Sequence, residues 1–136
     1  MRSASPPRHL FVYGTLRPGH APPEIAATVR RLREVGRASV RGCVHDLGAY
    51  PGALLDDSAA TRIDGIVLRL TADASVLAAL DAYEGFDPAD VARSLFLRTR
   101  TVVTLRDGRR LACWIYVWNG NPRTVPARQP SRQSTK

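Results

Sequence analysis

Two stretches of this sequence combine residue types that could carry chemistry. The first, residues 10–19, reads Leu-Phe-Val-Tyr-Gly-Thr-Leu-Arg-Pro-Gly, a short apolar run followed by a loop. An apolar run of this length is typical of a buried strand, and Gly14 permits a turn or a close approach to a ligand. Backbone N–H groups that converge in such a loop can bind an anion. The same pattern also fits a plain core strand with its turn.

The second stretch, residues 73–86, has the features of a capped helix. Asp73 is a good N-cap, Gly85 lies where a C-terminal glycine is expected, and the residues between them are rich in Ala and Leu. At about 100° per residue, Glu84 falls in one stripe with the leucines four and seven positions before it. Asp81 lies at the edge of that stripe. The sequence therefore predicts a carboxylate that points inward from the end of an apolar helix face.

An inward position has consequences for the Glu84 carboxyl group. A buried carboxylate must be paired, hydrogen-bonded or neutral. Burial and the negative end of the helix dipole both raise its pKa, and a carboxyl group that titrates nearer neutrality suits a general acid/base. The alternative is that Glu84 turns outward as the frayed last residue of a surface helix.

Taken together, the two stretches resemble the γ-glutamylcyclotransferase-like (AIG2-like) proteins. The loop 13–16 (Tyr-Gly-Thr-Leu) is similar to the family's Y-G-[ST]-L loop, and residues 80–85 (Leu-Asp-Ala-Tyr-Glu-Gly) are similar to its L-D-x-x-E-G segment. Three further segments agree with the family in order and spacing. They are the turn 46–52 and the strands 63–68 and 112–117. Each motif is weak alone, but the ordered set from about Leu10 to Asn119 is specific.

The sequence predicts an α+β fold, because strands outnumber helices without a regular βαβ alternation. Helices are expected at 23–34 and 73–85, a strand at 35–46, and a hairpin that turns at Asp107-Gly108. The resemblance sharpens this to a small mixed, mostly antiparallel β-barrel flanked by helices, with a pocket at one end. The domain is expected at 9–121, between disordered tails at 1–8 and 122–136.

The resemblance implies cyclotransfer on a γ-glutamyl amide, which releases 5-oxoproline and a free amine. Glu84 would be the general acid/base, and no metal or cofactor would be needed. The implied substrate-binding residues come from the first loop, the central turn and the last strand. They are Tyr13, Gly14, Thr15, Leu16, Tyr50 and Tyr116. Of the aromatic residues on one face of the last strand, Tyr116 is the one expected to present its hydroxyl to the site.

The sequence departs from the family pattern at one position near the site. The family commonly has Tyr-x-Arg after the catalytic glutamate, whereas this chain has Phe96-Leu97-Arg98. If the missing hydroxyl helps to shape the site, the substrate range differs. The leaving amine is open at this stage, and a positively charged one could use Asp81, Asp87 or Asp90.

The net charge of +8 raises the question of nucleic-acid binding. Six of the 20 Lys and Arg residues lie in the two terminal segments, and all 12 Asp and Glu residues lie between them. The other 14 cations therefore leave the body of the chain with a net charge of about +2. No aromatic residues that could stack bases are interleaved with the basic ones, so no specific nucleic-acid partner is expected.

Composition bounds the remaining functional classes. No apolar run reaches the ~20 residues that span a membrane, and Cys43 and Cys113 have no metal-binding spacing. We expect reduced, buried thiols in a cytoplasmic protein, which is a monomer or weak homodimer. A catalytically silent domain of the same fold that binds a small metabolite is the alternative to the enzyme.

Overall fold

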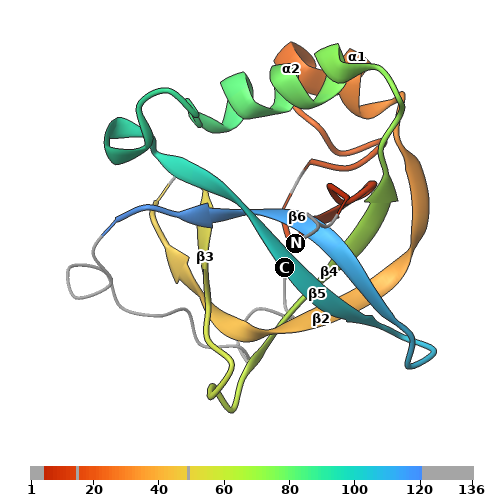
Figure 1. The fold of residues 1–136 in the computed structure, drawn as a ribbon, viewed down its shortest axis with the longest axis vertical. Helices are drawn as coiled ribbons and strands as arrows, with labels where there is room; N and C mark the ends of the chain where they lie inside the picture. The colour runs from red at the N-terminus through yellow and green to blue at the C-terminus, as the bar shows by residue number, and fades with distance from the viewer. Residues whose placement is uncertain (1–4, 15, 49, 121–136) are drawn as a thin grey trace.

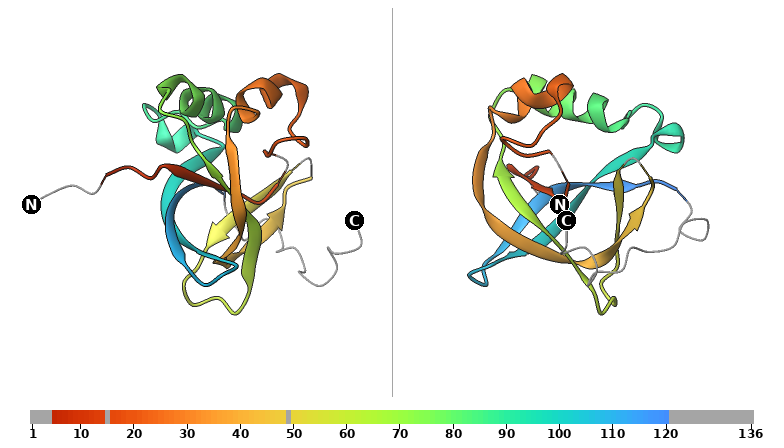
Figure 2. Two further views of the ribbon diagram at one scale, coloured as in Figure 1. Left: turned by 90° about the vertical axis from the view of Figure 1, so that its right-hand side faces the viewer. Right: turned by 180° about the vertical axis from the view of Figure 1, so that it is seen from behind.

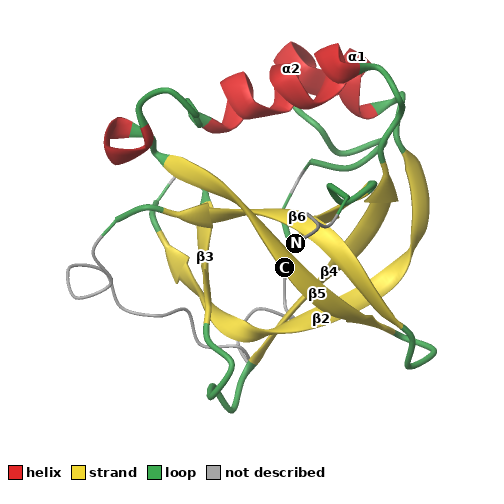
Figure 3. Cartoon of the chain, in the orientation of Figure 1, coloured by secondary structure: helices red, strands yellow, loops and turns green. Residues whose placement is uncertain are grey.

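In the described residues, five strands close a small barrel, a sixth strand is added to it, and two helices lie across one end (Figure 1). This computed structural model describes residues 5–14, 16–48 and 50–120. The side and rear views place both helices at the same end (Figure 2), and strands build the rest of the body (Figure 3). In chain order the elements are β1 (His9–Val12), α1 (Pro23–Val29), β2 (Arg33–Asp46), β3 (Pro51–Leu55), β4 (Arg62–Arg69), α2 (Ala74–Glu84), the 3-10 turn η1 (Val91–Arg93), β5 (Phe96–Leu105) and β6 (Arg110–Trp118).

The barrel closes through five strands in the ring β1-β4-β2-β5-β6, and β6 pairs again with β1. β3 is the additional strand and lies between β2 and β6. Only the β1–β6 and β3–β6 pairings are parallel; the other pairings are antiparallel. The expected mixed, mostly antiparallel barrel with flanking helices is confirmed.

Alternate residues of the strands serve two apolar clusters. Phe11, Val67 and Ile115 point into the barrel, whereas their neighbours Leu10 and Leu68 pack in a second cluster that includes α1 and α2 residues. Because the strands near the helices are covered on both faces, β4 carries three consecutive buried residues at 66–68. The cavity described below lies at the edge of the second cluster.

The first helix is shorter than the sequence pattern indicates. The spacing of Ile25, Val29 and Leu32 predicts a helix to residue 34, but α1 ends at Val29. Leu32 is still buried in the second cluster, so its apolar character reflects burial and not helical periodicity. Residues 33 and 34 instead pair with Arg69 and Leu68 of β4, and the strand therefore begins two residues earlier than expected.

The second helix forms as its sequence predicts. The Asp73 carboxylate accepts a hydrogen bond from the Ser75 N–H at 2.9 Å, which caps the N-terminus. At the other end Gly85 adopts φ 75°, a left-handed conformation that costs glycine little. The chain continues past residues 87–90 into η1, which the sequence analysis did not predict. The capped helix fixes where Glu84 lies relative to the barrel.

Gly65 allows β1 to approach β4 closely. A Cβ atom at Gly65 would overlap the carbonyl oxygen of Val12 and the ring of Phe11. We expect Gly65→Ala to lower the free energy of unfolding by at least about 1–3 kcal/mol, as overpacking does in a close-packed interior. Urea unfolding measures this loss. Gly36→Ala is the control, because a Cβ there meets nothing within 4 Å, and an equal effect of both substitutions would contradict the steric explanation.

The remaining expectations on the chain have mixed outcomes. Cys113 is buried, but Cys43 is only half-buried, and both are free thiols. Residues 1–4 of the first expected tail, the whole of the second expected tail (122–136) and the site residue Thr15 lie outside the described residues. In the described part of the chain, neither helix is both long and apolar enough to cross a membrane.

Candidate active site

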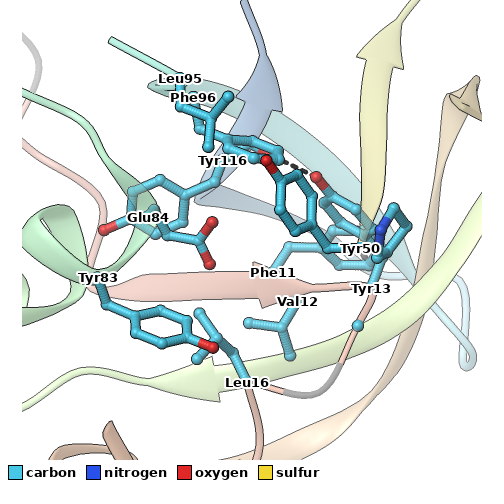
Figure 4. A pocket seen from close by; sticks show the side chains of 12 residues that line it. Phe11, Val12, Tyr13, Leu16, Tyr50, Tyr83, Glu84, Leu95, Phe96 and Tyr116 are labelled. Carbon is cyan, nitrogen blue, oxygen red and sulfur yellow. Dashed lines mark hydrogen bonds between the residues drawn. The ribbon is translucent and has the colours of Figure 1, made fainter. Parts of the chain in front are cut away.

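A cavity of about 260 Å³ opens between the end of α2 and the loop that follows β1 (Figure 4). Among the described residues, its wall combines aromatic and aliphatic side chains with one carboxyl group, that of Glu84. The lining residues are Phe11, Val12, Tyr13, Gly14, Leu16, Tyr50, Pro51, Tyr83, Glu84, Leu95, Phe96 and Tyr116. Five of the six expected substrate-binding residues are therefore in one wall with Glu84, and the sixth is Thr15.

Glu84 lies with its carboxyl group in the cavity, between the rings of Tyr83 and Tyr116 (Figure 4). The side chain is half-buried, and burial raises its pKa from 4.5 to about 7. None of the described residues forms a hydrogen bond or ion pair with it. A carboxyl group that is withdrawn from water and has no partner among the described residues is available to a ligand, and near neutral pH it can both accept and donate a proton.

The raised pKa of Glu84 makes this group a source of instability at high pH. Between pH 4.5 and about 7 the folded protein keeps a proton that the unfolded chain releases, so stability falls as the pH rises through that window. We expect Glu84→Gln to raise the free energy of unfolding by up to about 3 kcal/mol at pH 8, at roughly 1.4 kcal/mol per pKa unit. The gain should vanish near pH 4.5. Denaturant unfolding at both pH values measures it, and an equal gain at both would contradict the burial of the charge.

Tyr13 braces the loop with its hydroxyl group. That hydroxyl donates to the Tyr116 carbonyl at 2.6 Å and accepts from the Ala53 N–H at 3.1 Å, so one side chain joins the end of β1 to β6 and β3. The first of these bonds is the dashed line in Figure 4. Burial raises the pKa of the Tyr13 phenol. The Tyr13 ring lines the cavity, while its hydroxyl group is occupied by hydrogen bonds to β6 and β3.

Gly14 and Leu16 also line the cavity. The backbone conformation that would require a glycine at position 14 is not observed. The φ of Gly14 is not positive, and a Cβ there would lie 3.6 Å from Pro51 Cγ, an ordinary contact. The turn 46–52 supplies Tyr50 and Pro51 to the opposite side of the cavity. The Tyr50 ring packs against Phe96 with centroids 5.7 Å apart.

Tyr116 lines the cavity, but its hydroxyl is not directed at the cavity as the sequence analysis expected. It donates to Asp81 Oδ1 at 2.7 Å. Arg98 donates to both oxygens of the same carboxylate, at 2.8 and 3.2 Å, and its guanidinium lies 4.3 Å from the Trp114 ring centroid. This buried network ties α2 to β5 and β6 one turn before Glu84.

The three acids proposed for a charged leaving amine do not line the cavity. Asp81 is engaged by Arg98 and Tyr116, Asp87 accepts from the Ala89 N–H, and Asp90 lies 4.0 Å from Arg93. That expectation is therefore wrong on geometric grounds. Sequence spacing indicates that these acids lie near Glu84, but it does not determine the directions in which their side chains point.

Two lining residues that escaped the sequence analysis are Tyr83 and Leu95, whereas Phe96, the departure from the family pattern expected near the site, does line the cavity. Tyr83 precedes the acid directly, and that adjacency was the available signal. Leu95 comes to the cavity because its N–H donates to the Gly85 carbonyl at 2.9 Å, a bond between segments that no sequence period encodes. In the described part of the chain, no three His, Cys, Asp or Glu residues gather into a metal site.

The barrel and its two helices have the fold of γ-glutamylcyclotransferase-like proteins. An AIG2-like protein from Mus musculus superposes with a TM-score of 0.67 at 20% identity, over 90% of this chain and 86% of the mouse chain. A structure described as gamma-glutamyl cyclotransferase gives 0.60 at 15% identity, over 88% and 68%. YkqA from Bacillus subtilis gives 0.62 at 23% identity, over 83% of this chain but only 36% of YkqA. At these identities the likeness concerns the fold.

The sequence itself identifies the family. The model of the family "Gamma-glutamyl cyclotransferase, AIG2-like" matches residues 10–134, and the chain belongs to that family. Comparison with curated protein sequences gave no significant match.

Proposed function

We propose that this protein is a γ-glutamylamine-type cyclotransferase. The substrate's own α-amine would attack its γ-carbonyl, a five-membered lactam would form, and the γ-linked amine would leave. The observation that carries the proposal is the Glu84 carboxyl group, which has no partner among the described residues and is the one acid among those that line the cavity. Burial raises the pKa of this group to about 7, which suits proton transfer in both directions.

The proton movements follow from the chemistry of the amide. The α-ammonium group gives one proton to the Glu84 carboxylate, and the resulting amine forms the new N–C bond. As the old C–N bond breaks, the leaving nitrogen receives the Glu84 proton and a second proton from the attacking nitrogen. One of the three ammonium protons therefore stays on the lactam, two end on the leaving amine, and Glu84 returns to its starting state.

The loop after β1 is proposed to hold the glutamyl α-carboxylate. Tyr13, Gly14 and Leu16 line the cavity, and consecutive backbone N–H groups can form an anion site. The bond from Tyr13 to the Tyr116 carbonyl fixes the start of this loop. Holding the amine and the γ-carbonyl at attack distance is the second large contribution to the rate.

The experiment that tests the proposal is release of 5-oxoproline by the purified protein from a panel of γ-glutamyl amides. Release from at least one amide, with equimolar release of the free amine, supports cyclotransfer. Release of glutamate in place of 5-oxoproline would indicate simple hydrolysis. Binding of the amides without turnover would favour a catalytically silent binding domain.

A further inference from the structure

Exposed apolar side chains border the Glu84 cavity. Large exposed apolar side chains are few in the described residues, and three of them line this one cavity: Tyr50, Tyr83 and Leu95. They come from three separate segments, the turn before β3, the end of α2 and the residue before β5. A cluster of exposed apolar side chains at a concave site marks a surface that binds an apolar ligand.

The rim formed by Tyr50, Tyr83 and Leu95 is held in place by the surrounding backbone. Leu95 donates its N–H to the Gly85 carbonyl at 2.9 Å and accepts from the Asn119 N–H at 3.1 Å. Tyr50 packs on Phe96. In Figure 4 the three side chains surround the Glu84 carboxyl group from different sides. The apolar rim is therefore part of the same cavity as the acid.

The polar groups of the cavity are already assigned to the two charges on the glutamyl half of the substrate. Glu84 would meet the α-ammonium group, and the backbone of the first loop would meet the α-carboxylate. No Lys, Arg or His and no second acid line the described wall. The Asp81 carboxylate is occupied by Arg98 and Tyr116. A third charge, on the leaving half, would lose hydration without gaining a partner.

We infer that the leaving group is a small, uncharged apolar or aromatic amine, seated on the rim of Tyr50, Tyr83 and Leu95. This inference rests on the proposed cyclotransfer. A carboxylate on the leaving half would repel ionised Glu84, and an ammonium group would compete with the α-ammonium for it. The cavity volume of about 260 Å³ lies just below the ~300–1,000 Å³ usual for ligand pockets, so the amine is small.

Two matched pairs of substrates isolate the effect of a charge on the leaving half. γ-Glutamyl-phenylethylamide and γ-glutamyl-phenylalanine share the ring and differ only in the carboxylate. γ-Glutamyl-pentylamide and γ-glutamyl-cadaverine differ only in a terminal ammonium group. We expect kcat/KM for 5-oxoproline release to be at least tenfold higher for the neutral member of each pair. Equal rates, or faster turnover of either charged member, would overturn the inference.

A variant of the rim, together with a matched control, tests whether the rim produces the preference for neutral amides. Leu95→Lys places a cation at the cavity, and it should narrow the preference for the phenylethylamide over the phenylalanine derivative at least threefold. Val102→Lys introduces the same charge on β5 away from the cavity, at nearly the same exposure (45% against 44% for Leu95), and should leave the preference unchanged. An unchanged preference in Leu95→Lys would show that the rim does not determine the selectivity.

Binding to the Glu84→Gln protein, measured by calorimetry with the same four amides, separates this inference from the proposed reaction. Absence of turnover by the wild-type protein, together with at least tenfold tighter binding of the neutral members to the Glu84→Gln protein, would overturn cyclotransfer and leave the rim's selectivity standing. Turnover without a neutral preference would overturn only the inference. Neither turnover nor binding would overturn both.

Discussion

Glu84→Gln is expected to lower 5-oxoproline release by at least about 10²-fold, the usual contribution of a positioned acid/base. Glutamine keeps the shape of the side chain but cannot take a proton from the α-ammonium group. Because the substrate still fits, the loss should fall mainly on kcat. Steady-state kinetics with the best amide of the panel measures it. Glu34→Gln, which changes an exposed acid on β2, is the control and should keep full activity.

The wild-type pH profile tests the same assignment without a substitution. In the proposed mechanism the carboxylate form of Glu84 is the active one, so kcat/KM should rise with pH and level off above about 7, where burial places the pKa of this group. A folded Glu84→Gln protein that retains full turnover would overturn the assignment. So would a wild-type profile that stays flat between pH 5 and 8.

Arg98→Ala is expected to cause the largest loss of stability, about 3–5 kcal/mol, because it leaves a buried carboxylate without its cation. The Arg98 side chain is 17% exposed and reaches Asp81 at 2.8 Å. Truncation also removes the contact of its guanidinium with the Trp114 ring. Chemical denaturation measures the change in the free energy of unfolding, and Arg98→Lys provides a milder variant if the alanine protein does not fold.

A matched ion pair at the surface provides the control. Arg109 reaches Asp107 at the same 2.8 Å, but its side chain is 71% exposed. Exposed pairs of this kind contribute about 0–1 kcal/mol, so Arg109→Ala should change stability little. Equal losses in the two variants would show that burial of the Asp81–Arg98 pair does not decide its contribution.

Local signals in the sequence were sufficient for several elements. The caps at Asp73 and Gly85 delimit α2, and Asp107-Gly108 marks the turn between β5 and β6. These features depend on backbone preferences of a few neighbouring residues, which a single sequence carries. The resemblance to a family then supplied the barrel, which local signals do not determine.

The rest of the site depends on contacts between distant residues. Asp81 bonds to Arg98 and Tyr116, 17 and 35 residues away, and helical periodicity gave only its place at the edge of a stripe. The Tyr116 hydroxyl was expected in the cavity because the strand period gives the face of a residue but not its partner. The end of α1 was misplaced for a similar reason, since pairing with β4 overrides helical spacing.

The parallel pairing of β1 with β6 has a consequence for how the chain is made. Leu10 lies opposite Trp114, and the Tyr13 hydroxyl reaches the Tyr116 carbonyl across 103 positions. During synthesis the first strand must therefore wait for nearly the whole domain to leave the ribosome before its second edge is covered, and contacts this far apart in sequence form slowly. A nascent chain that ends before Arg110 has Glu84 but no closed barrel around it. We conclude that the cavity is completed only when the last strand emerges.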